Sequence, residues 1–349
     1  PTASLLHGVL ETGERSVWWQ RRAREVELSG RGRARRLQVR REARVCGRDE
    51  ELTRLAGALQ LAALGEGQVA LIEGESGIGK TRLVDEFVRL HGDAIELLFG
   101  SYPPGGAATA EGALSTAFRE HLGPTGLEAR LQELLPEMPG LVSPFADLLR
   151  GTGHPESAER MSTDTISTAF VETARALARR KPLVLFLDNL DVAPREAQVI
   201  FGALANAIRD EPILLIGAFR PGAVGEDLAR VQSHGHTTRI VLSRLGPQDL
   251  TELLTDALGS LSLAHNLGWD IARKSDGNPF YLFEILRDLR ERKRLVRDES
   301  GIWRTTGLVR EIETPHSLRD LLRARLHLSL IHISEPTRLG MLSRMPSAA

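Results

Sequence analysis

The stretch Gly74-Glu75-Ser76-Gly77-Ile78-Gly79-Lys80-Thr81 decides the fold of this chain. A short apolar run precedes it at residues 68–73. After it, apolar side chains recur at helical spacing, at Leu83, Val84, Phe87 and Val88. This pattern predicts a buried strand, a glycine-rich turn and an amphipathic helix in direct succession.

The glycine-rich turn is typical of a backbone that wraps around a phosphate group. Glycines let the chain curl, so that successive N–H groups point at one anion. The N-terminus of the following helix adds a partial positive charge. In the pattern G-x-x-x-x-G-K-[ST], the lysine reaches the β- and γ-phosphates and the next hydroxyl ligates Mg²⁺. We therefore expect ATP or ADP with Mg²⁺ to bind at Gly74, Gly77, Ile78, Gly79, Lys80 and Thr81. The alternative, a chance glycine-rich turn, is disfavoured by the flanking strand and helix.

A candidate metal ligand follows a second apolar run, residues 183–187, which ends at Asp188. In open α/β sheets, ligands bind at the carboxyl ends of the strands. We expect Asp188 to hold Mg²⁺ through water, together with Thr81. An aspartate after a strand is also a common turn residue. Its combination with the phosphate-binding turn favours the metal-binding interpretation.

The residue after Asp188 bears on catalysis. Many hydrolases of this kind place a second acid there to orient or deprotonate water, whereas this chain has Asn189. Asparagine cannot act as a general base. The sequence therefore predicts nucleotide binding and puts hydrolysis in doubt.

Arg220 follows a third apolar run, residues 213–219. A guanidinium at the end of that strand could contact the γ-phosphate and report its presence. The alternative is a surface arginine before the Pro221-Gly222 turn. Because strand ends carry ligands in such sheets, we favour the first interpretation and take Asp188 and Arg220 as the candidate catalytic residues.

Strand and helix patterns alternate along most of the chain. Apolar runs predict strands at 68–73, 95–99, 182–187, 212–218 and 238–242. Helical spacing predicts helices at 49–64, 79–91, 109–122 and 163–180. Beyond Pro247 we expect helices at 247–258, 262–274, 278–292 and 315–327, with a hairpin at 294–306. The fold class is therefore α/β with a largely parallel sheet, followed by a mostly helical unit.

Composition excludes several classes of protein. The 349 residues are 26% charged and 42% hydrophobic, which excludes collagen, a disulfide scaffold and wholesale disorder. The single cysteine, Cys46, favours a reducing compartment. No apolar run approaches the ~20 residues of a membrane helix. We therefore expect a cytoplasmic protein with no membrane partner, and since the chain begins at Pro1 we interpret it as a fragment.

The two ends of the chain differ from its centre. Residues 1–48 hold twelve arginines and five acidic residues. We interpret residues 1–44 as a basic linker or the remnant of an upstream domain; nucleic-acid binding with Trp18 and Trp19 as stacking groups is a less favoured alternative. Residues 329–349 break the leucine spacing before them and resemble translated sequencing-adapter read-through. We interpret them as a non-native tail, with a native tail as the alternative.

The order of motifs resembles the signal-transduction ATPases with numerous domains (STAND). More narrowly, it is similar to the AAA-type ATPase modules that resemble origin-recognition ATPases and occur in large bacterial regulators. The motifs are CGRDEEL at 46–52, GESGIGKTRLVDEF at 74–87, LVLFLDNLDVAP at 183–194, LLIGAFRP at 214–221 and SDGNPFYLFEIL at 275–286. The match covers roughly residues 45 to 328.

The resemblance implies further features. Gly47 and Arg48 would lie near the adenine or ribose, and Pro279 would open a lid helix and lie against the adenine. The fold would be that of a P-loop NTPase with sheet order 5-1-4-3-2, with Lys80 and Asp188 on adjacent strands. The chain departs from the family pattern at Asn189 and at Asp191-Val192.

The expected domains follow from these motifs. Residues 45–246 would form the P-loop ATPase domain, and residues 247–328 a helical lid with a truncated winged-helix-like part. We expect an ATP-binding regulatory switch of a multidomain bacterial signalling or transcription regulator, with effector domains missing from this fragment. An active ATPase and a DNA-binding module stay open as alternatives; the second would use the face of Arg319, Arg323 and Arg325. A nucleotide-dependent oligomer also stays open.

Overall fold

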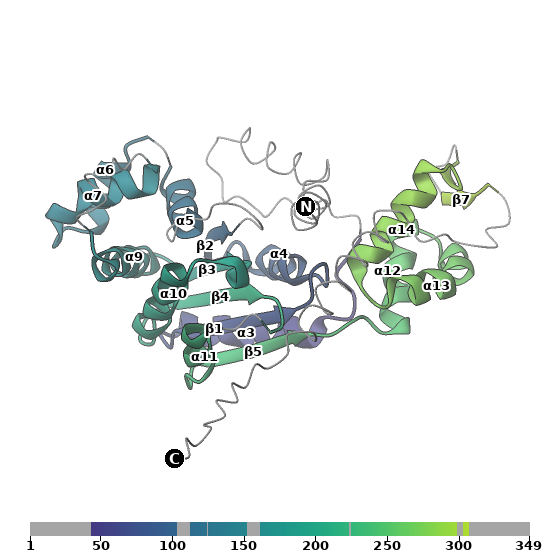
Figure 1. Cartoon of the computed structure of the whole chain (residues 1–349), viewed down its shortest axis with the longest axis horizontal. Coiled ribbons are helices and arrows are strands. Elements are labelled where there is room, and N and C mark those ends of the chain that lie inside the picture. Colours follow the sequence, from purple (N-terminus) through teal and green to yellow (C-terminus); the bar gives the residue numbers. More distant parts are fainter. Residues whose placement is uncertain are drawn as a thin grey trace, which may run out of the picture. The chain divides into compact units, whose positions relative to one another are not determined.

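A five-stranded parallel sheet forms the centre of the first part of the chain (Figure 1). The computed structural model describes residues 43–102, 112–123, 125–151, 161–222, 225–298 and 303–306, all of which fall within the compact unit Gly30–Ile312. The strands are β1 (Gln68–Gly74), β2 (Glu96–Ser101), β3 (Leu183–Asp188), β4 (Ile213–Phe219) and β5 (Thr237–Leu242). They lie in the order β2-β3-β4-β1-β5, and every neighbouring pair is parallel. Read from the other edge, this order is the expected 5-1-4-3-2, so the prediction is confirmed.

One expectation about the sheet is wrong. Lys80 follows β1 and Asp188 ends β3, but these strands are not adjacent, because β4 lies between them. Leu214 of β4 is opposite Gln68 on one side and Val184 on the other. The chain crosses over after β3 and returns to the middle of the sheet. The carboxyl end of β4 therefore lies between the two halves of the candidate site.

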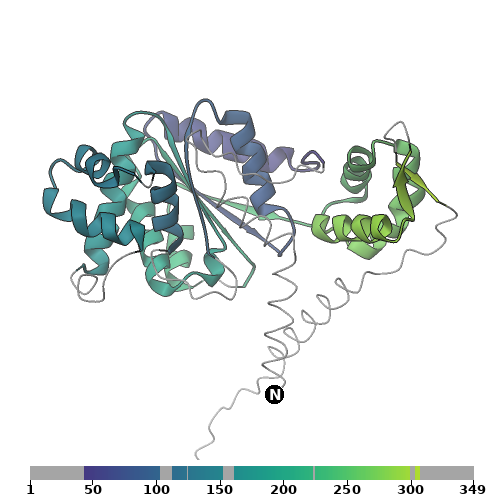
Figure 2. The ribbon, with the colours of Figure 1, turned by 90° about the horizontal axis from the view of Figure 1, so that it is seen from above.

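Helices occupy both faces of the sheet (Figures 1 and 2). In the first part of the chain they are α3 (Asp49–Ala63), α4 (Lys80–His91), α5 (Gly112–Leu122), α6 (Leu127–Leu134), α7 (Pro139–Arg150), α9 (Thr163–Ala178), α10 (Arg195–Ala207) and α11 (Glu226–Gln232), with the short 3-10 helix η1 (Leu190–Val192). Helices α6, α7, α10 and α11 were not predicted from the sequence. No helix among the described residues has the length and apolarity needed to cross a membrane.

The strands supply side chains to two separate cores. Leu183, Leu185 and Leu187 of β3 pack with α5, α6, α7, α9 and α10 on one face. Val184 and Phe186 pack with α3 and α4 on the other face. Successive strand residues point to opposite faces, so a strand that is covered on both sides is apolar throughout. This is why the sequence of β3 reads as a continuous apolar run.

A third core belongs to the helices that follow the sheet. These are α12 (Pro247–Leu258), α13 (Leu261–Ser275) and α14 (Pro279–Glu291), followed by the antiparallel pair β6 (Leu295–Arg297) and β7 (Trp303–Thr305). Leu254, Ile271 and Leu286, one from each helix, are fully buried together. The mostly helical C-terminal part is thus confirmed, as is the hairpin within 294–306. Residues 1–42 of the linker expected at 1–44, the helix at 315–327 and the tail at 329–349 lie outside the described residues.

Candidate nucleotide site

The site is built on the turn between β1 and α4, residues 75–79, which we call the phosphate loop. Gly77 and Gly79 have φ angles of 77° and 107°, a region that residues with a side chain rarely adopt. A Cβ atom on Gly77 would also lie 2.5 Å from Cβ of Phe280. The glycines of the motif are therefore required by the backbone conformation and by close packing. Helix α4 begins at Lys80, so its N-terminal N–H groups lie at the end of the loop.

Lys80 lies along the phosphate loop. Its side chain is buried, with 8% of its surface exposed. Nζ donates hydrogen bonds to the carbonyl oxygens of Gly74 (2.8 Å) and Glu75 (3.1 Å). This position holds the ammonium group beside the loop that would surround a phosphate.

Thr81 and Asp188 are brought together from α4 and the end of β3. The Thr81 hydroxyl donates a 2.7 Å hydrogen bond to Oδ2 of Asp188. A hydroxyl and a carboxylate at this distance fit a Mg²⁺ ion that is bound directly by Thr81 and through water by Asp188. Among the described residues, no group of three or more His, Cys, Asp or Glu side chains could hold a metal. The Mg²⁺ expected here would therefore take its remaining ligands from nucleotide phosphates and water.

Asn189 faces away from the phosphate loop. Its backbone is left-handed (φ 59°, ψ 43°), a conformation that asparagine tolerates better than most residues. Its side-chain Nδ2 donates to Oγ of Ser101 (3.2 Å) and to the carbonyl of Tyr102 (3.1 Å), at the end of β2. Because β2 lies beyond β3 when viewed from β1, the amide joins the edge of the sheet to its centre.

Arg220 is held by Asp191, a residue that the sequence singled out only as a departure from the family pattern. Nε of Arg220 donates to Oδ2 of Asp191 (2.5 Å), and its backbone N–H donates to Oδ1 (3.3 Å). The Asp191 side chain is 1% exposed, whereas that of Arg220 is 47% exposed. The guanidinium is therefore fixed at one edge and accessible at the other.

Gly47 and Arg48 lie where the chain enters α3. Arg48 is buried, and its guanidinium donates to the carbonyl of Ser243 (2.5 Å) and pairs with Glu51 (3.1 Å). Gly47 packs so closely against Asp249 of α12 that a side chain would collide with it. In this arrangement the two residues connect α3 to the segment after β5. Their contact with adenine or ribose stays a prediction.

The lid, which is our name for α12, α13 and α14, contacts the phosphate loop through the first turn of α14. Asn278 caps α14 by accepting a hydrogen bond from the Phe280 N–H (3.0 Å), and its Nδ2 donates to the carbonyl of Ser76 (3.1 Å). The Phe280 N–H also lies 3.3 Å from the carbonyl of Gly77. Pro279 is the first residue of the helix, as its fixed φ favours. The expected helix start is present, and it lies on the phosphate loop.

An ion-pair network joins the lid to the same loop and was not predicted. Arg244 lies 3.2 Å from both carboxylate oxygens of Glu75 and also pairs with Asp276 at the end of α13. These residues are 169 and 32 positions from Arg244 in the sequence. A single sequence gives no signal for such a pairing.

The segment 43–48 passes between α4 and the lid. The Ala43 carbonyl accepts a hydrogen bond from Arg82 of α4 (3.1 Å), and Arg44 pairs with Asp256 of α12 (3.2 Å). Cys46 is buried in the lid core. Burial, and then the charges of Glu252 and Asp256, raises the pKa of the Cys46 thiol to about 11.

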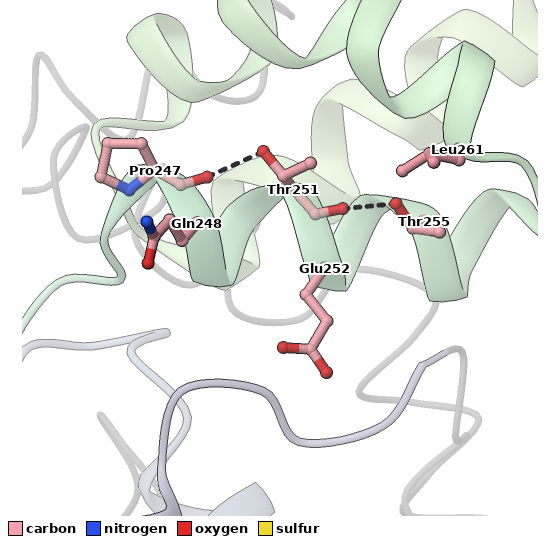
Figure 3. Close-up of a pocket in the computed structure, with 6 residues that line it drawn as sticks. All are labelled: Pro247, Gln248, Thr251, Glu252, Thr255 and Leu261. Atoms are coloured by element: carbon pink, nitrogen blue, oxygen red, sulfur yellow. Dashed lines mark hydrogen bonds between the residues drawn. The ribbon is translucent and has the colours of Figure 1, made fainter.

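A surface pocket on the lid lies outside this site (Figure 3). It has a volume of about 520 Å³ and is lined by Pro247, Gln248, Thr251, Glu252, Thr255 and Leu261. Both threonine hydroxyls donate to carbonyls of their own helix, and Glu252 is the charged lining residue. The pocket therefore offers a phosphate no cationic side chain.

The sheet order and the strand–loop–helix unit with Lys80 and Thr81 define the class as a P-loop nucleotide-binding fold. Within that class, residues 44–216 match the AAA ATPase domain family. This segment of the chain is thus similar to an AAA ATPase domain.

Individual relatives are distant. An uncharacterized protein of Rhizobium meliloti (strain 1021) is 27% identical over 254 residues, which are 68% of this chain and 24% of that protein. This chain therefore spans about a quarter of the length of the curated relative that it matches. Among solved structures, it is similar to the Orc1 protein of Aeropyrum pernix in complex with DNA (17% identity, TM-score 0.45, 84% of this chain and 69% of that one). It is also similar to Cdc6p of Pyrobaculum aerophilum (16% identity, TM-score 0.46, 72% and 64%) and to RuvB of Thermotoga maritima (15% identity, TM-score 0.40, 81% and 70%). At these identities the likeness is one of fold alone.

Proposed function

We propose that this chain is an ATP-binding switch module of a larger bacterial signalling or transcription regulator, of the STAND type, with slow or no ATP hydrolysis. The observation that carries the proposal is the contact of the lid with the phosphate loop through Asn278 and Phe280. These bonds use carbonyl groups of the same loop whose N–H groups would surround a phosphate. If nucleotide binding changes the conformation of the loop, the hydrogen bonds between the loop and the lid would therefore change as well.

A switch also requires that ATP and ADP act differently. A ligand shifts a conformational equilibrium only through its differential affinity for the two states. The expected contacts of Lys80 and Arg220 with the γ-phosphate, which ADP lacks, supply such a difference. We propose Asp188 and Thr81 as the Mg²⁺ site, and Gly47, Arg48 and Pro279 as the residues around the adenine and ribose.

The thiol of Cys46 gives a direct test of the switch, because the chain has no other cysteine. A buried thiol with a pKa of about 11 reacts only when the lid core opens. We expect the rate of Cys46 modification by a thiol reagent to differ at least about fivefold between Mg²⁺·ATP and Mg²⁺·ADP, the lower end of typical coupling between sites. Lys80→Ala, whose nucleotide affinity should be too low for occupancy at concentrations that saturate the wild type, is the control and should show one rate under both conditions. Equal rates with ATP and ADP in the wild-type protein would contradict a switch.

DNA binding stays the alternative. The Orc1 protein of Aeropyrum pernix is in complex with DNA in its structure. In this chain, the arginines that would form a recognition face, Arg319, Arg323 and Arg325, lie outside the described residues. A steep decrease of duplex affinity with rising salt would favour this alternative.

A further inference from the structure

We propose that Asp191 is a positioning residue that orients Arg220 toward the γ-phosphate and thereby makes the site distinguish ATP from ADP. The inference rests on the proposed function, since it concerns the same nucleotide site. Asp191 is one of the positions at which the chain departs from the family pattern. The inference rests on the geometry of its buried carboxylate.

The burial of Asp191 requires an explanation. Its side chain is 1% exposed, and buried carboxylates are rare unless they are paired. Both oxygens accept hydrogen bonds from the same residue: Oδ2 from Nε of Arg220 and Oδ1 from the Arg220 backbone N–H. Asp191 thus fixes both the backbone of Arg220 and the base of its guanidinium.

The pairing leaves the outer edge of the guanidinium available. Among the described residues, the bonds that Arg220 makes through its side chain use Nε alone, and the side chain is 47% exposed. The terminal nitrogens Nη1 and Nη2 carry four N–H groups in one plane. This planar fork binds phosphate oxygens in pairs, and holding Nε in place reduces the side-chain freedom lost on binding.

The position of Arg220 at the end of β4 explains why we expect it to contact the γ-phosphate. Phe219, the last residue of β4, is opposite Glu73 of β1, and Gly217 is opposite Leu187 of β3. Arg220 therefore emerges between the phosphate loop that follows β1 and Asp188 at the end of β3. The loop is expected to hold the phosphates that ATP and ADP share, and Thr81 and Asp188 would hold Mg²⁺ beside them. In this proposal, the guanidinium held between these two segments would meet the third phosphate.

A purely structural ion pair would have different consequences. Removing it would lower stability and weaken both nucleotides alike. A positioning role instead weakens the triphosphate selectively, and only while Arg220 is present.

A double-mutant cycle separates the two cases. Dissociation constants for Mg²⁺·ADP and for the non-hydrolysable Mg²⁺·AMP-PNP are measured by calorimetry on the wild type, Asp191→Asn, Arg220→Ala and the double variant. We expect Arg220→Ala to weaken AMP-PNP binding by roughly tenfold or more, the loss typical of a hydrogen bond to a charged group, with little change for ADP. Asp191→Asn should weaken AMP-PNP by roughly fivefold, because it keeps the shape but removes one of the two acceptors. In the double variant, Asp191→Asn should add nothing to the effect of Arg220→Ala.

The matched control is Asp227→Asn. Asp227 is a partly buried aspartate that pairs with Arg195 and Arg230 on α10 and α11, and its loss should leave both affinities unchanged. Should Asp191→Asn fail to fold, Arg220→Lys serves as the second variant, because lysine keeps the charge but lacks the Nε that Asp191 holds and the planar fork. It should weaken AMP-PNP binding more than ADP binding.

Equal weakening of ADP and AMP-PNP by Asp191→Asn, or additive losses in the double variant, would overturn the inference while leaving nucleotide binding intact. Equal changes in AMP-PNP and ADP affinity in Arg220→Lys would overturn it as well. A wild-type protein that binds neither nucleotide would instead overturn the proposed function, and the inference with it.

Discussion

Replacing Lys80 with alanine should weaken ATP binding by about 100-fold or more. The ammonium group lies along the phosphate loop and is expected to donate to oxygens of the β- and γ-phosphates. Hydrogen bonds between charged groups contribute about 1.5–3 kcal/mol each, and each 1.4 kcal/mol corresponds to about tenfold in affinity. Calorimetric titration with Mg²⁺·ATP measures the effect.

Lys181→Ala serves as the control, because Lys181 lies before β3, at the opposite end of that strand from Asp188. Its affinity for ATP should equal that of the wild type. Unchanged affinity in Lys80→Ala would contradict the assignment of residues 75–79 as a phosphate-binding loop.

Replacing Asn189 with glutamate should raise ATP hydrolysis by about 10- to 1,000-fold. A general base typically contributes about 10² to 10⁴ in rate. Residue 189 is left-handed, and a glutamate there would be strained by about 1–2 kcal/mol. The backbone conformation that presents the carboxylate would therefore be populated roughly tenfold less, and the gain in rate would be smaller by the same factor. Glutamate also cannot donate to Ser101 and Tyr102, so its side chain is released from the end of β2. Phosphate release under saturating ATP measures turnover.

Asn189→Gln is the matched control, because it has the length of glutamate and no carboxylate. It should hydrolyse ATP as slowly as the wild-type protein. If Asn189→Glu and Asn189→Gln turn over at the same rate, then the missing acid is not what limits hydrolysis.

Much of the sheet could be predicted because its strands are covered on both faces. β3 and β4 are apolar at nearly every position and stand out between turn residues. The phosphate loop could be predicted because its glycines, lysine and threonine follow a fixed spacing with a physical cause.

Two of the helices that were not predicted differ in the strength of their sequence pattern. In α10 the apolar residues Ala197, Ile200, Phe201 and Leu204 do follow helical spacing. In α7 the spacing is interrupted by Pro144, and a proline inside a pattern normally ends a helix.

Contacts between distant segments could not be predicted. The expectation that Lys80 and Asp188 follow adjacent strands was wrong, and it was inconsistent with the expected order 5-1-4-3-2, in which β4 separates β1 from β3. Asp191 and Arg220 are 29 residues apart, and nothing in either segment points to the other. The contacts of the lid with the phosphate loop likewise join residues some 200 positions apart. These pairings join segments that lie far apart in the sequence, so only the folded chain shows them.

The most direct test of the account is a crystal structure of the protein with Mg²⁺·AMP-PNP. We predict a Mg²⁺ ion at about 2.1 Å from Oγ1 of Thr81, with a metal-bound water between the ion and Asp188. The β- and γ-phosphates should lie within hydrogen-bond distance of Nζ of Lys80. A nucleotide bound elsewhere on the chain, or a metal ion without Thr81 among its ligands, would contradict the central claim.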